Sequence, residues 1–283
     1  MKETVSKLKA ALTPIYGKGE SDAIIRLIFH YLKGWNLTDI LTHSEDELSP
    51  FLKQEIDSIL ERLLNFEPIQ YITGTARFHG FDLKVEPGVL IPRPETEQLV
   101  DLIIDENSNR QDLRILDICT GSGCIAIALA KDLPFSEVTA LDISEKAIAI
   151  AKENSAARKV KVNYIRKDIF EWKPSQEFDI IVSNPPYVLD SEASGIERNV
   201  MDYEPHEALF VRDDDPLRFY IRIAKIGKEC LAQNGKIYFE TNPLTVRELK
   251  NKMERLGYAE VQILRDSFGK ERFLTALNRG SDY

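Results

Sequence analysis

The sequence predicts an α/β fold in which a mostly parallel, seven-stranded sheet follows a small helical bundle and a β-hairpin linker. Beyond about residue 113, short apolar runs alternate with helix-length segments, which is the pattern of parallel strands joined by crossover helices. Before residue 67, apolar residues recur at the three-and-four spacing of helices. The 283 residues also exceed the usual size of one domain, about 100 to 200 residues, so we expect two domains.

The expected boundaries follow these changes of pattern. Residues 1–66 form the helical domain, and nothing in them has the spacing of a catalytic site. Residues 67–91 form the linker, where short apolar runs flank His79 and Gly80 as in a hairpin. Residues 92–283 form the α/β domain, which opens with the proline-braced stretch "PRPETE" and a helix.

Seven segments of the second domain have the length and apolar content of strands. They are residues 114–119, 137–141, 161–166, 178–183, 235–240, 261–265 and 272–277. Only "DSFGKE" separates the last two, which is too short for a crossover helix, so we expect that pair to be antiparallel.

The composition argues against a membrane protein and against a protein that binds long polyanions nonspecifically. The formal net charge is -9, whereas phosphate binding draws on clustered Lys and Arg, so we expect no stable nucleic-acid partner. No segment approaches the roughly 18 to 20 apolar residues of a membrane span, and residues 1–7 lack the apolar core of a signal peptide. We therefore expect a cytoplasmic protein. The 3 cysteines form no CxxC pair, and we expect no metal site.

A ligand loop is predicted in "ILDICTGSGCIAIALA", residues 115–130, which reads as a strand, a glycine turn and a helix. Gly121 and Gly123 let the backbone bend sharply and approach a ligand closely. Asp142 ends the next strand, where a carboxylate can accept both hydroxyls of a ribose. The stretch also satisfies the GxGxxA form of the dinucleotide fingerprint, so a nicotinamide-dependent enzyme is one alternative.

Two features favour S-adenosylmethionine over a dinucleotide. Asp117 stands directly before the loop, where a carboxylate would repel a pyrophosphate but suits a ligand that carries an ammonium group. Asp168 and Ile169 follow the third strand, where they could bracket an adenine. The second feature is the stretch "NPPY" at residues 184–187.

The "NPPY" stretch follows the fourth strand, so it lies at the carboxyl edge of the sheet, where open α/β sheets bind ligands. Asn184 offers a side-chain carbonyl, and Pro186 cannot donate, so the carbonyl of Pro185 is a second acceptor. Two such acceptors can hold the NH₂ group of a planar amine or amide, and Tyr187 supplies a ring on which it can lie. Positioning of this kind contributes as much as about 7 to 11 kcal/mol, so no strong base is needed.

Together these residues resemble the HemK/PrmC family, the protein-(glutamine) methyltransferases that modify the glutamine of the GGQ motif in bacterial peptide chain release factors and so tune translation termination. The likeness covers nearly the whole chain. It rests on "EPIQYITG", "PRPETE", "DICTGSG", "NPPY" and "YEPHEAL". The resemblance implies a Rossmann-like class I S-adenosylmethionine-dependent methyltransferase domain, with S-adenosylhomocysteine as product. The helical domain is then expected to recognise the substrate, a release factor.

The resemblance also implies site residues. The expected cofactor contacts are Cys119, Thr120, Gly121, Ser122, Gly123, Asp142, Asp168, Ile169 and Asn184. The resemblance implies seven of them, and Cys119 and Asp168 are added because they stand beside the glycine loop and the third strand. The glutamine side chain is placed against Asn184, Pro185, Pro186 and Tyr187, which we take as the catalytic residues. Cys119 departs from the family, in which glycine is frequent at that position. Arg93 and Glu95 lie in a loop braced by two prolines and are possible further site residues.

Two other functions remain open at this point. A methyltransferase acting on an exocyclic amine of adenine or guanine, in DNA or RNA, would use the same four residues. A nonenzymatic helical adaptor with a degenerate methyltransferase fold is the other, although the intact Asn184 and Asp142 argue against degeneration.

Overall fold

The computed structural model describes residues 1–280, which divide into two compact units. The smaller unit contains Met1–Thr75 and a second segment, Glu197–Tyr203. The larger unit contains Ala76–Ile196 and the described residues from Glu204 onward. Each unit has its own hydrophobic core.

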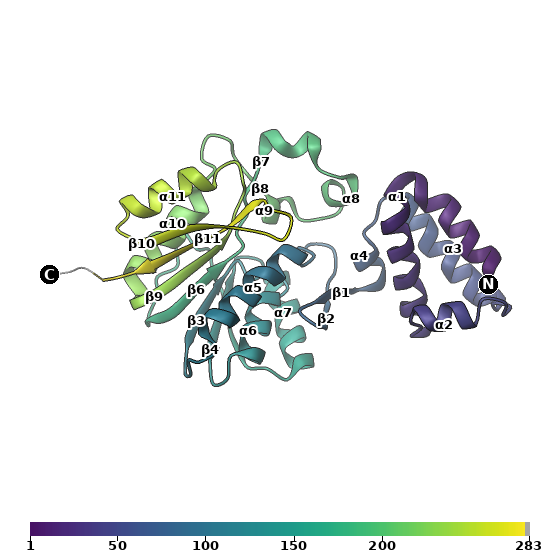
Figure 1. Ribbon diagram of the computed structural model, residues 1–283, viewed down its shortest axis with the longest axis horizontal. Helices are drawn as coiled ribbons and strands as arrows, with labels where there is room; N and C mark the ends of the chain where they lie inside the picture. Colours follow the sequence, from purple (N-terminus) through teal and green to yellow (C-terminus); the bar gives the residue numbers. More distant parts are fainter. Residues whose placement is uncertain (281–283) are drawn as a thin grey trace. The chain divides into compact units, whose positions relative to one another are not determined.

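The smaller unit is helical, as the sequence predicts (Figure 1). Its helices in the amino-terminal segment are α1 (Lys2–Lys33), α2 (Leu37–Thr42), α3 (Pro50–Leu64) and α4 (Ile69–Thr73). Gly17 interrupts α1 with a φ of 73°, a left-handed conformation that glycine adopts at little cost. Ser49 caps α3 by accepting a hydrogen bond from the amide of Leu52. Leu8, Ile28 and Ile56 are fully buried in the core.

The sequence did not indicate that the segment Glu197–Tyr203 belongs to the helical unit. This segment contains the short helix α8 (Arg198–Met201) and belongs to the smaller unit although its neighbours on both sides in the chain belong to the larger one. The Arg198 guanidinium lies 4.0 Å from the ring centroid of Phe66. The Tyr203 hydroxyl donates to the carbonyl of Asn65 at 2.9 Å. A cation–π contact and a hydrogen bond therefore attach the segment Glu197–Tyr203 to the rest of this unit.

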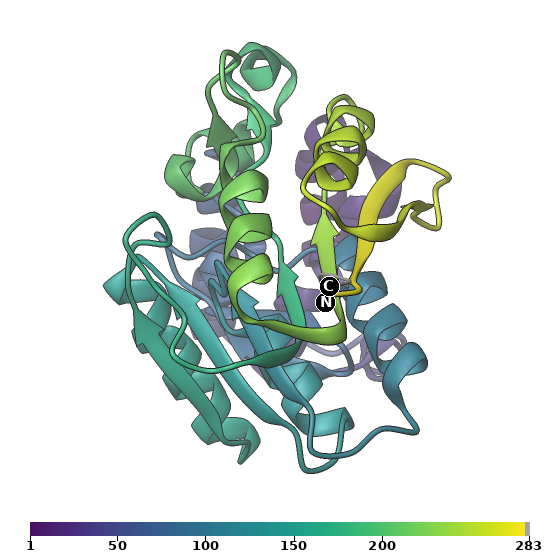
Figure 2. The ribbon, with the colours of Figure 1, turned by 90° about the vertical axis from the view of Figure 1, so that its left-hand side faces the viewer.

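The larger unit contains the expected seven-stranded, mostly parallel sheet, in the order β10-β11-β9-β6-β3-β4-β5. Its strands are β3 (Arg114–Ile118), β4 (Glu137–Asp142), β5 (Val162–Arg166), β6 (Phe178–Ser183), β9 (Leu231–Glu240), β10 (Ala259–Arg265) and β11 (Glu271–Asn278). β11 pairs antiparallel with both β9 and β10, so the expected antiparallel pair is confirmed. Figure 2 shows this pair, in yellow, at one edge of the sheet.

Helices cover both faces of the sheet (Figure 1). They are α5 (Pro94–Asn107), α6 (Cys124–Asp132) and α7 (Glu145–Arg158) on one face, and α10 (Arg218–Cys230) and α11 (Val246–Arg255) on the other. The strand residues at the centre, such as Ile115, Leu116 and Ile180, are fully buried, as expected for a parallel sheet covered twice.

The hairpin predicted between the domains is formed by β1 (Thr75–Phe78) and β2 (Phe81–Lys84). His79 and Gly80, with φ of 44° and 78°, form the left-handed turn that two-residue hairpins favour. Phe78 and Leu83 are fully buried in the same core cluster as residues of α5 and α6. All but the first residue of the hairpin therefore belong to the larger unit.

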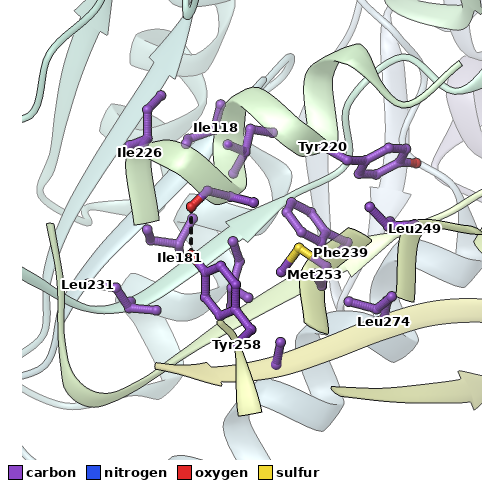
Figure 3. Close-up of a cluster of buried hydrophobic side chains, with 14 of the residues drawn as sticks. Ile118, Ile181, Tyr220, Ile226, Leu231, Phe239, Leu249, Met253, Tyr258 and Leu274 are labelled. Atoms are coloured by element: carbon purple, nitrogen blue, oxygen red, sulfur yellow. Dashed lines mark hydrogen bonds between the residues drawn. The ribbon is translucent and has the colours of Figure 1, made fainter. Parts of the chain in front are cut away.

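Close packing between α10 and the residue before β10 depends on one glycine. The Tyr258 hydroxyl donates to the carbonyl of Ala224 in α10 at 2.7 Å, and this bond is the dashed line in Figure 3. A Cβ at Gly227, one turn along α10, would overlap that hydroxyl. Tyr258 is 4% exposed and packs with Ile181, Met253 and other core residues (Figure 3).

Long connections follow β6 at the carboxyl edge of the sheet. They contain β7 (Val188–Leu189), the 3₁₀ turn η1 (Asp190–Gly195), α9 (His206–Leu209) and β8 (Phe210–Val211), where β7 and β8 form a small parallel sheet. Loops at this edge are where open α/β sheets place their sites. Among residues 1–280, no helix is both long and apolar enough to cross a membrane.

Candidate active site

A cavity of about 320 Å³ opens beside the ends of β3, β4 and β6. Of the residues predicted for the site, those that line it are Arg93, Cys119, Thr120, Gly121, Ser122, Asp142, Asp168, Ile169, Asn184 and Pro186. Four other predicted residues, all within the described part of the chain, are outside that lining: Glu95, Gly123, Pro185 and Tyr187. The volume is in the range of small-molecule sites.

The glycine loop after β3 forms one wall of the cavity. Cys119 and Thr120 both donate their amides to the carbonyl of Leu141, at 2.8 and 3.1 Å, which ties the loop to β4. Cys119 has a φ of 63°, a left-handed conformation that disfavours side chains other than glycine. Gly121, with a φ of 55°, has open space where a Cβ would stand, so a ligand can approach its backbone.

Gly123 has a different role from Gly121. Its φ is 82°, and a Cβ there would lie 3.0 Å from the Ala151 Cβ and 3.1 Å from the Tyr164 hydroxyl. The glycine therefore permits the close packing of the loop against α7 and β5. It supports the cavity wall and is not part of the lining.

Asp142 at the end of β4 braces the same loop. Its two oxygens accept hydrogen bonds from the amides of Gly121 and Ser144, each at 2.9 Å. A carboxylate has about four acceptor positions, so both oxygens keep capacity toward the cavity. Burial raises the pKa of Asp142 despite these hydrogen bonds.

Asp117 lies beneath the loop and is fully buried. One oxygen accepts from the Thr120 hydroxyl at 2.6 Å and from the Ala126 amide at 3.2 Å, and the other has no hydrogen-bond partner. Desolvation raises the pKa of Asp117 to about 7. Asp117 is outside the cavity lining, and its expected contact with a cationic ligand remains a prediction.

The loop after β5 forms another part of the wall. Asp168 accepts a hydrogen bond from the Phe170 amide at 2.8 Å, and Ile169 presents a buried apolar side chain to the cavity. Arg222 of α10 fixes the loop by donating to the carbonyls of Ile169 and Trp172, at 2.8 and 2.6 Å. Ile169 can thus contact a flat apolar group in the cavity.

Arg93 is held by a buried carboxylate that the sequence did not predict. Glu204 accepts from Arg93 at 2.5 Å and from the amide of Ile91 at 3.1 Å, and its side chain is 1% exposed. A charge-assisted pair of this kind fixes geometry strongly. Glu204 thus joins the "PRPETE" and "YEPHEAL" stretches at the cavity, whereas Glu95 lies outside the lining.

Asn184 contacts a buried polar chain behind the cavity wall. Its side-chain NH₂ donates to the Thr96 hydroxyl at 3.2 Å, and that hydroxyl donates to Glu240 at 2.7 Å. The other oxygen of Glu240 accepts from the Tyr187 hydroxyl at 3.0 Å. Glu240 is 1% exposed, and burial raises its pKa. Burial beside Glu240 also raises the pKa of Tyr187, which therefore remains a donor.

Tyr187 supports this wall from behind, and Pro185 is buried beside it in the chain. The amide of Tyr187 donates to the carbonyl of Leu209 at 3.1 Å, and its ring packs against the core cluster beneath the sheet. The expected contacts of Pro185 and Tyr187 with a substrate amide remain predictions.

Sequence reasoning missed several residues of the site. Thr96, Phe170, Arg218 and Phe219 line the cavity, and Glu204 and Glu240 brace it. The Arg218 guanidinium lies 4.8 Å from the ring centroid of Phe170. Thr96 stands within "PRPETE" and Glu204 within "YEPHEAL", and their places in these two stretches were the one signal in the sequence that could have indicated them. Among residues 1–280, no group of three or more His, Cys, Asp or Glu is arranged to hold a metal ion.

The fold and the cavity define a methyltransferase of class I, and structural comparison agrees. A methyltransferase from Pyrococcus furiosus, 19% identical, matches with a TM-score of 0.54 over 80% of this chain and 100% of its own. A Thermus thermophilus 16S rRNA methyltransferase in complex with AdoMet and guanosine, also 19% identical, matches with a TM-score of 0.52 over 72% of this chain and 50% of its own. At this identity the likeness shows the fold.

Sequence comparison identifies the family. Residues 2–74 match the PrmC N-terminal domain, and residues 94–202 match the methyltransferase small domain. The release factor glutamine methyltransferase of Bacteroides thetaiotaomicron is 46% identical over 98% of this chain and 99% of its own length. Those of Flavobacterium psychrophilum and Streptococcus pneumoniae are 41% and 40% identical, over 93% and 94% of this chain and 94% of each relative. The chain belongs to the release factor glutamine methyltransferase family.

Proposed function

We propose that this protein transfers a methyl group from S-adenosylmethionine to the side-chain amide nitrogen of the glutamine in the GGQ motif of peptide chain release factors, releasing S-adenosylhomocysteine. Full-length similarity to relatives named for this activity supports the reaction. The observation that carries it in the structure is the position of Asn184 in the wall of the same cavity as the glycine loop and Asp142. A group that can hold an amide thus lies beside a site that can hold a nucleoside.

The cavity residues fit S-adenosylmethionine. Gly121 leaves room for a ligand against its backbone, and Asp142 keeps acceptor capacity for ribose hydroxyls. Ile169 offers an apolar surface for adenine, and Asp168 stands beside it. When bound, S-adenosylmethionine supplies an electrophilic methyl group on a sulfonium sulfur.

Asn184 and its neighbours would prepare the glutamine. An amide nitrogen is a weak nucleophile because its lone pair is delocalised into the carbonyl. The Asn184 side-chain oxygen and the Pro185 carbonyl would accept the two hydrogens of the glutamine NH₂ and hold the nitrogen in a reactive orientation. The same acceptors stabilise positive charge that develops on nitrogen as its bond to the methyl carbon forms and the sulfur–methyl bond breaks, and the methylated nitrogen then releases one proton to solvent. Arg93, held by Glu204, would keep the adjoining loop closed against the site.

Methyl transfer from labelled S-adenosylmethionine tests this function. Purified release factor, its GGQ glutamine-to-alanine variant, DNA and RNA would be offered side by side. We expect label on the native factor and none on the variant. Label on nucleic acid alone would keep the fold and the site but overturn the substrate.

We also infer that the helical unit positions the release factor, in the cytoplasm where translation terminates. Its apolar side chains include Leu41 and Phe51, which are 65% and 70% exposed. A protein substrate that uses such a surface should be methylated far more efficiently than a short GGQ peptide. Equal kcat/KM on the whole factor and on the peptide would contradict this role.

A further inference from the structure

We propose that Thr96 and Glu240 are positioning residues that fix the side-chain amide of Asn184 with its oxygen toward the acceptor substrate. The inference rests on the proposed function, because it assigns Asn184 to the substrate amide. Thr96 comes from the start of α5, Glu240 from the end of β9, and Asn184 directly follows β6. Three separate elements therefore contribute to one chain of hydrogen bonds.

The direction of each hydrogen bond follows from the chemistry of Glu240. An ionised carboxylate only accepts hydrogen bonds. The Thr96 hydroxyl, 2.7 Å away, must therefore donate its one hydrogen to Glu240. The Tyr187 hydroxyl donates to the other carboxylate oxygen at 3.0 Å. Both oxygens of Glu240 are therefore engaged by donors.

The orientation of Asn184 then follows from Thr96. With its hydrogen committed, the Thr96 oxygen can only accept, and the NH₂ end of Asn184 is the end that can donate to it at 3.2 Å. The amide oxygen of Asn184 consequently points away from Thr96. A flipped amide would instead present an NH₂ group to the NH₂ group of the substrate, and two donors repel.

Burial makes this arrangement rigid. Thr96 and Glu240 are 2% and 1% exposed, so water does not compete for their hydrogen bonds. The half-buried Arg272 provides a nearby positive charge that favours the ionised carboxylate. Tyr220 donates to the backbone carbonyl of Glu240 at 3.0 Å, which fixes the end of β9. The polar chain is thus supported by the fold before any substrate binds.

The test uses two substitutions at Thr96 in the full chain. Thr96→Val keeps the shape and removes the hydroxyl, whereas the matched control Thr96→Ser keeps the hydroxyl. We expect Thr96→Val to lower kcat on the methylated acceptor by roughly 10- to 100-fold, the scale of a small misplacement of a reacting group. We expect KM for the release factor and the affinity for S-adenosylhomocysteine, measured by calorimetry, to change by less than about threefold. The reason is that the substitution changes the orientation of the Asn184 amide and leaves the binding contacts in place. Thr96→Ser should retain kcat within about threefold of the unsubstituted protein.

Two results would overturn the proposal. Unchanged kcat in Thr96→Val would show that the hydroxyl does not orient Asn184. An equal loss in Thr96→Ser would show that the shape of the side chain matters and its hydroxyl does not. If Thr96→Val fails to fold, Glu240→Met gives a second test, because it keeps a similar volume and removes the acceptor of the Thr96 hydroxyl, and unchanged kcat there would also refute the proposal.

The kinetics also separate this proposal from the proposed function. If the unsubstituted protein methylates nucleic acid and leaves the release factor unlabelled, the assigned substrate is wrong. The Thr96 variants would then be compared on the acceptor that is methylated, because Asn184 must present its oxygen to any planar NH₂ group.

Discussion

The side-chain NH₂ of Asn154 donates to the carbonyl oxygen of Ser122 at 2.9 Å. The same NH₂ group donates to the carbonyl of Lys84 at 3.0 Å, and the Asn154 oxygen accepts from the Lys84 amide at 2.7 Å. Asn154 thus links the glycine loop to the hairpin through α7. It is 3% exposed, and three protein groups depend on it for hydrogen bonds.

Asn154→Ala should therefore weaken both the cavity and the fold. The substitution leaves an amide and two carbonyls without their partner, so we expect a loss of about 2 to 3 kcal/mol in the free energy of unfolding. The loosened loop should lower the affinity for S-adenosylhomocysteine by about tenfold or more. Urea denaturation and calorimetry measure the two effects. The matched control is Asn163→Ala on the exposed edge strand β5, and equal effects of the two substitutions would contradict the role of Asn154.

The buried carboxyl of Asp117 should make stability depend on pH. Its folded pKa is about 7, above the unfolded value of 3.8, so between these values the folded state holds a proton that the unfolded state has lost. Stability contributed by this proton is present at low pH and falls as pH rises toward 7. From about pH 5 to about pH 7 the loss amounts to about 2 kcal/mol.

Asp117→Asn removes this dependence. The Asn oxygen can accept from Thr120 and Ala126, as the carboxylate does, and its NH₂ takes the place of the oxygen that has no partner. We expect the stability of the variant relative to the original protein to increase as pH rises through this range. Unfolding free energies from urea titrations at several pH values provide the measurement. Parallel curves for the two proteins would show that Asp117 does not titrate there.

The sheet was predictable because local chemistry specifies it. Buried parallel strands such as β6 appear in the sequence as uninterrupted apolar runs, and the short "DSFGKE" connection requires an antiparallel pair. The glycine loop and "NPPY" were recognisable for the same reason, since their residues stand next to one another in the chain.

The supporting residues of the site were not predictable in this way. Thr96 and Glu240 are 144 residues apart, and Arg93 and Glu204 are 111 apart. Only the completed sheet brings such pairs together, so no local spacing indicates them. Asp117 shows the reverse case. Its place before the loop suggested a ligand contact, whereas its carboxylate is fully buried and accepts hydrogen bonds from Thr120 and Ala126.

Turnover should fall as pH decreases through the raised pKa of Glu240. A protonated Glu240 can donate to the Thr96 hydroxyl, which can then turn its own hydrogen toward Asn184, and burial raises the pKa of this carboxyl. The ionised form is lost below that pKa, so kcat should decline on the acid side. Glu240→Gln does not titrate, so it should lack this acid-side decline. The measurement is kcat at saturating substrates from about pH 5 to about pH 9. An identical acid limb in both proteins would assign the titration to another group.

Gly227→Ala should destabilise the larger unit without touching the cavity. The added Cβ would overlap the Tyr258 hydroxyl, so the ring must move away from α10. That movement breaks the bond from Tyr258 to the Ala224 carbonyl and disturbs the contacts with Ile181 and Met253. Overpacking of this kind costs about 1 to 3 kcal/mol, to which the lost hydrogen bond adds about 1.

The double variant with Tyr258→Phe tests the cause of this loss. Phenylalanine lacks the hydroxyl that meets the added Cβ, so Gly227→Ala should be less destabilising in the Tyr258→Phe background than in the original protein. The hydrogen bond itself is absent from that background, so the difference reports the overlap together with the broken bond. Thermal and urea unfolding of the four proteins measure the coupling. Strict additivity would show that Gly227 is required for a reason other than the approach of Tyr258.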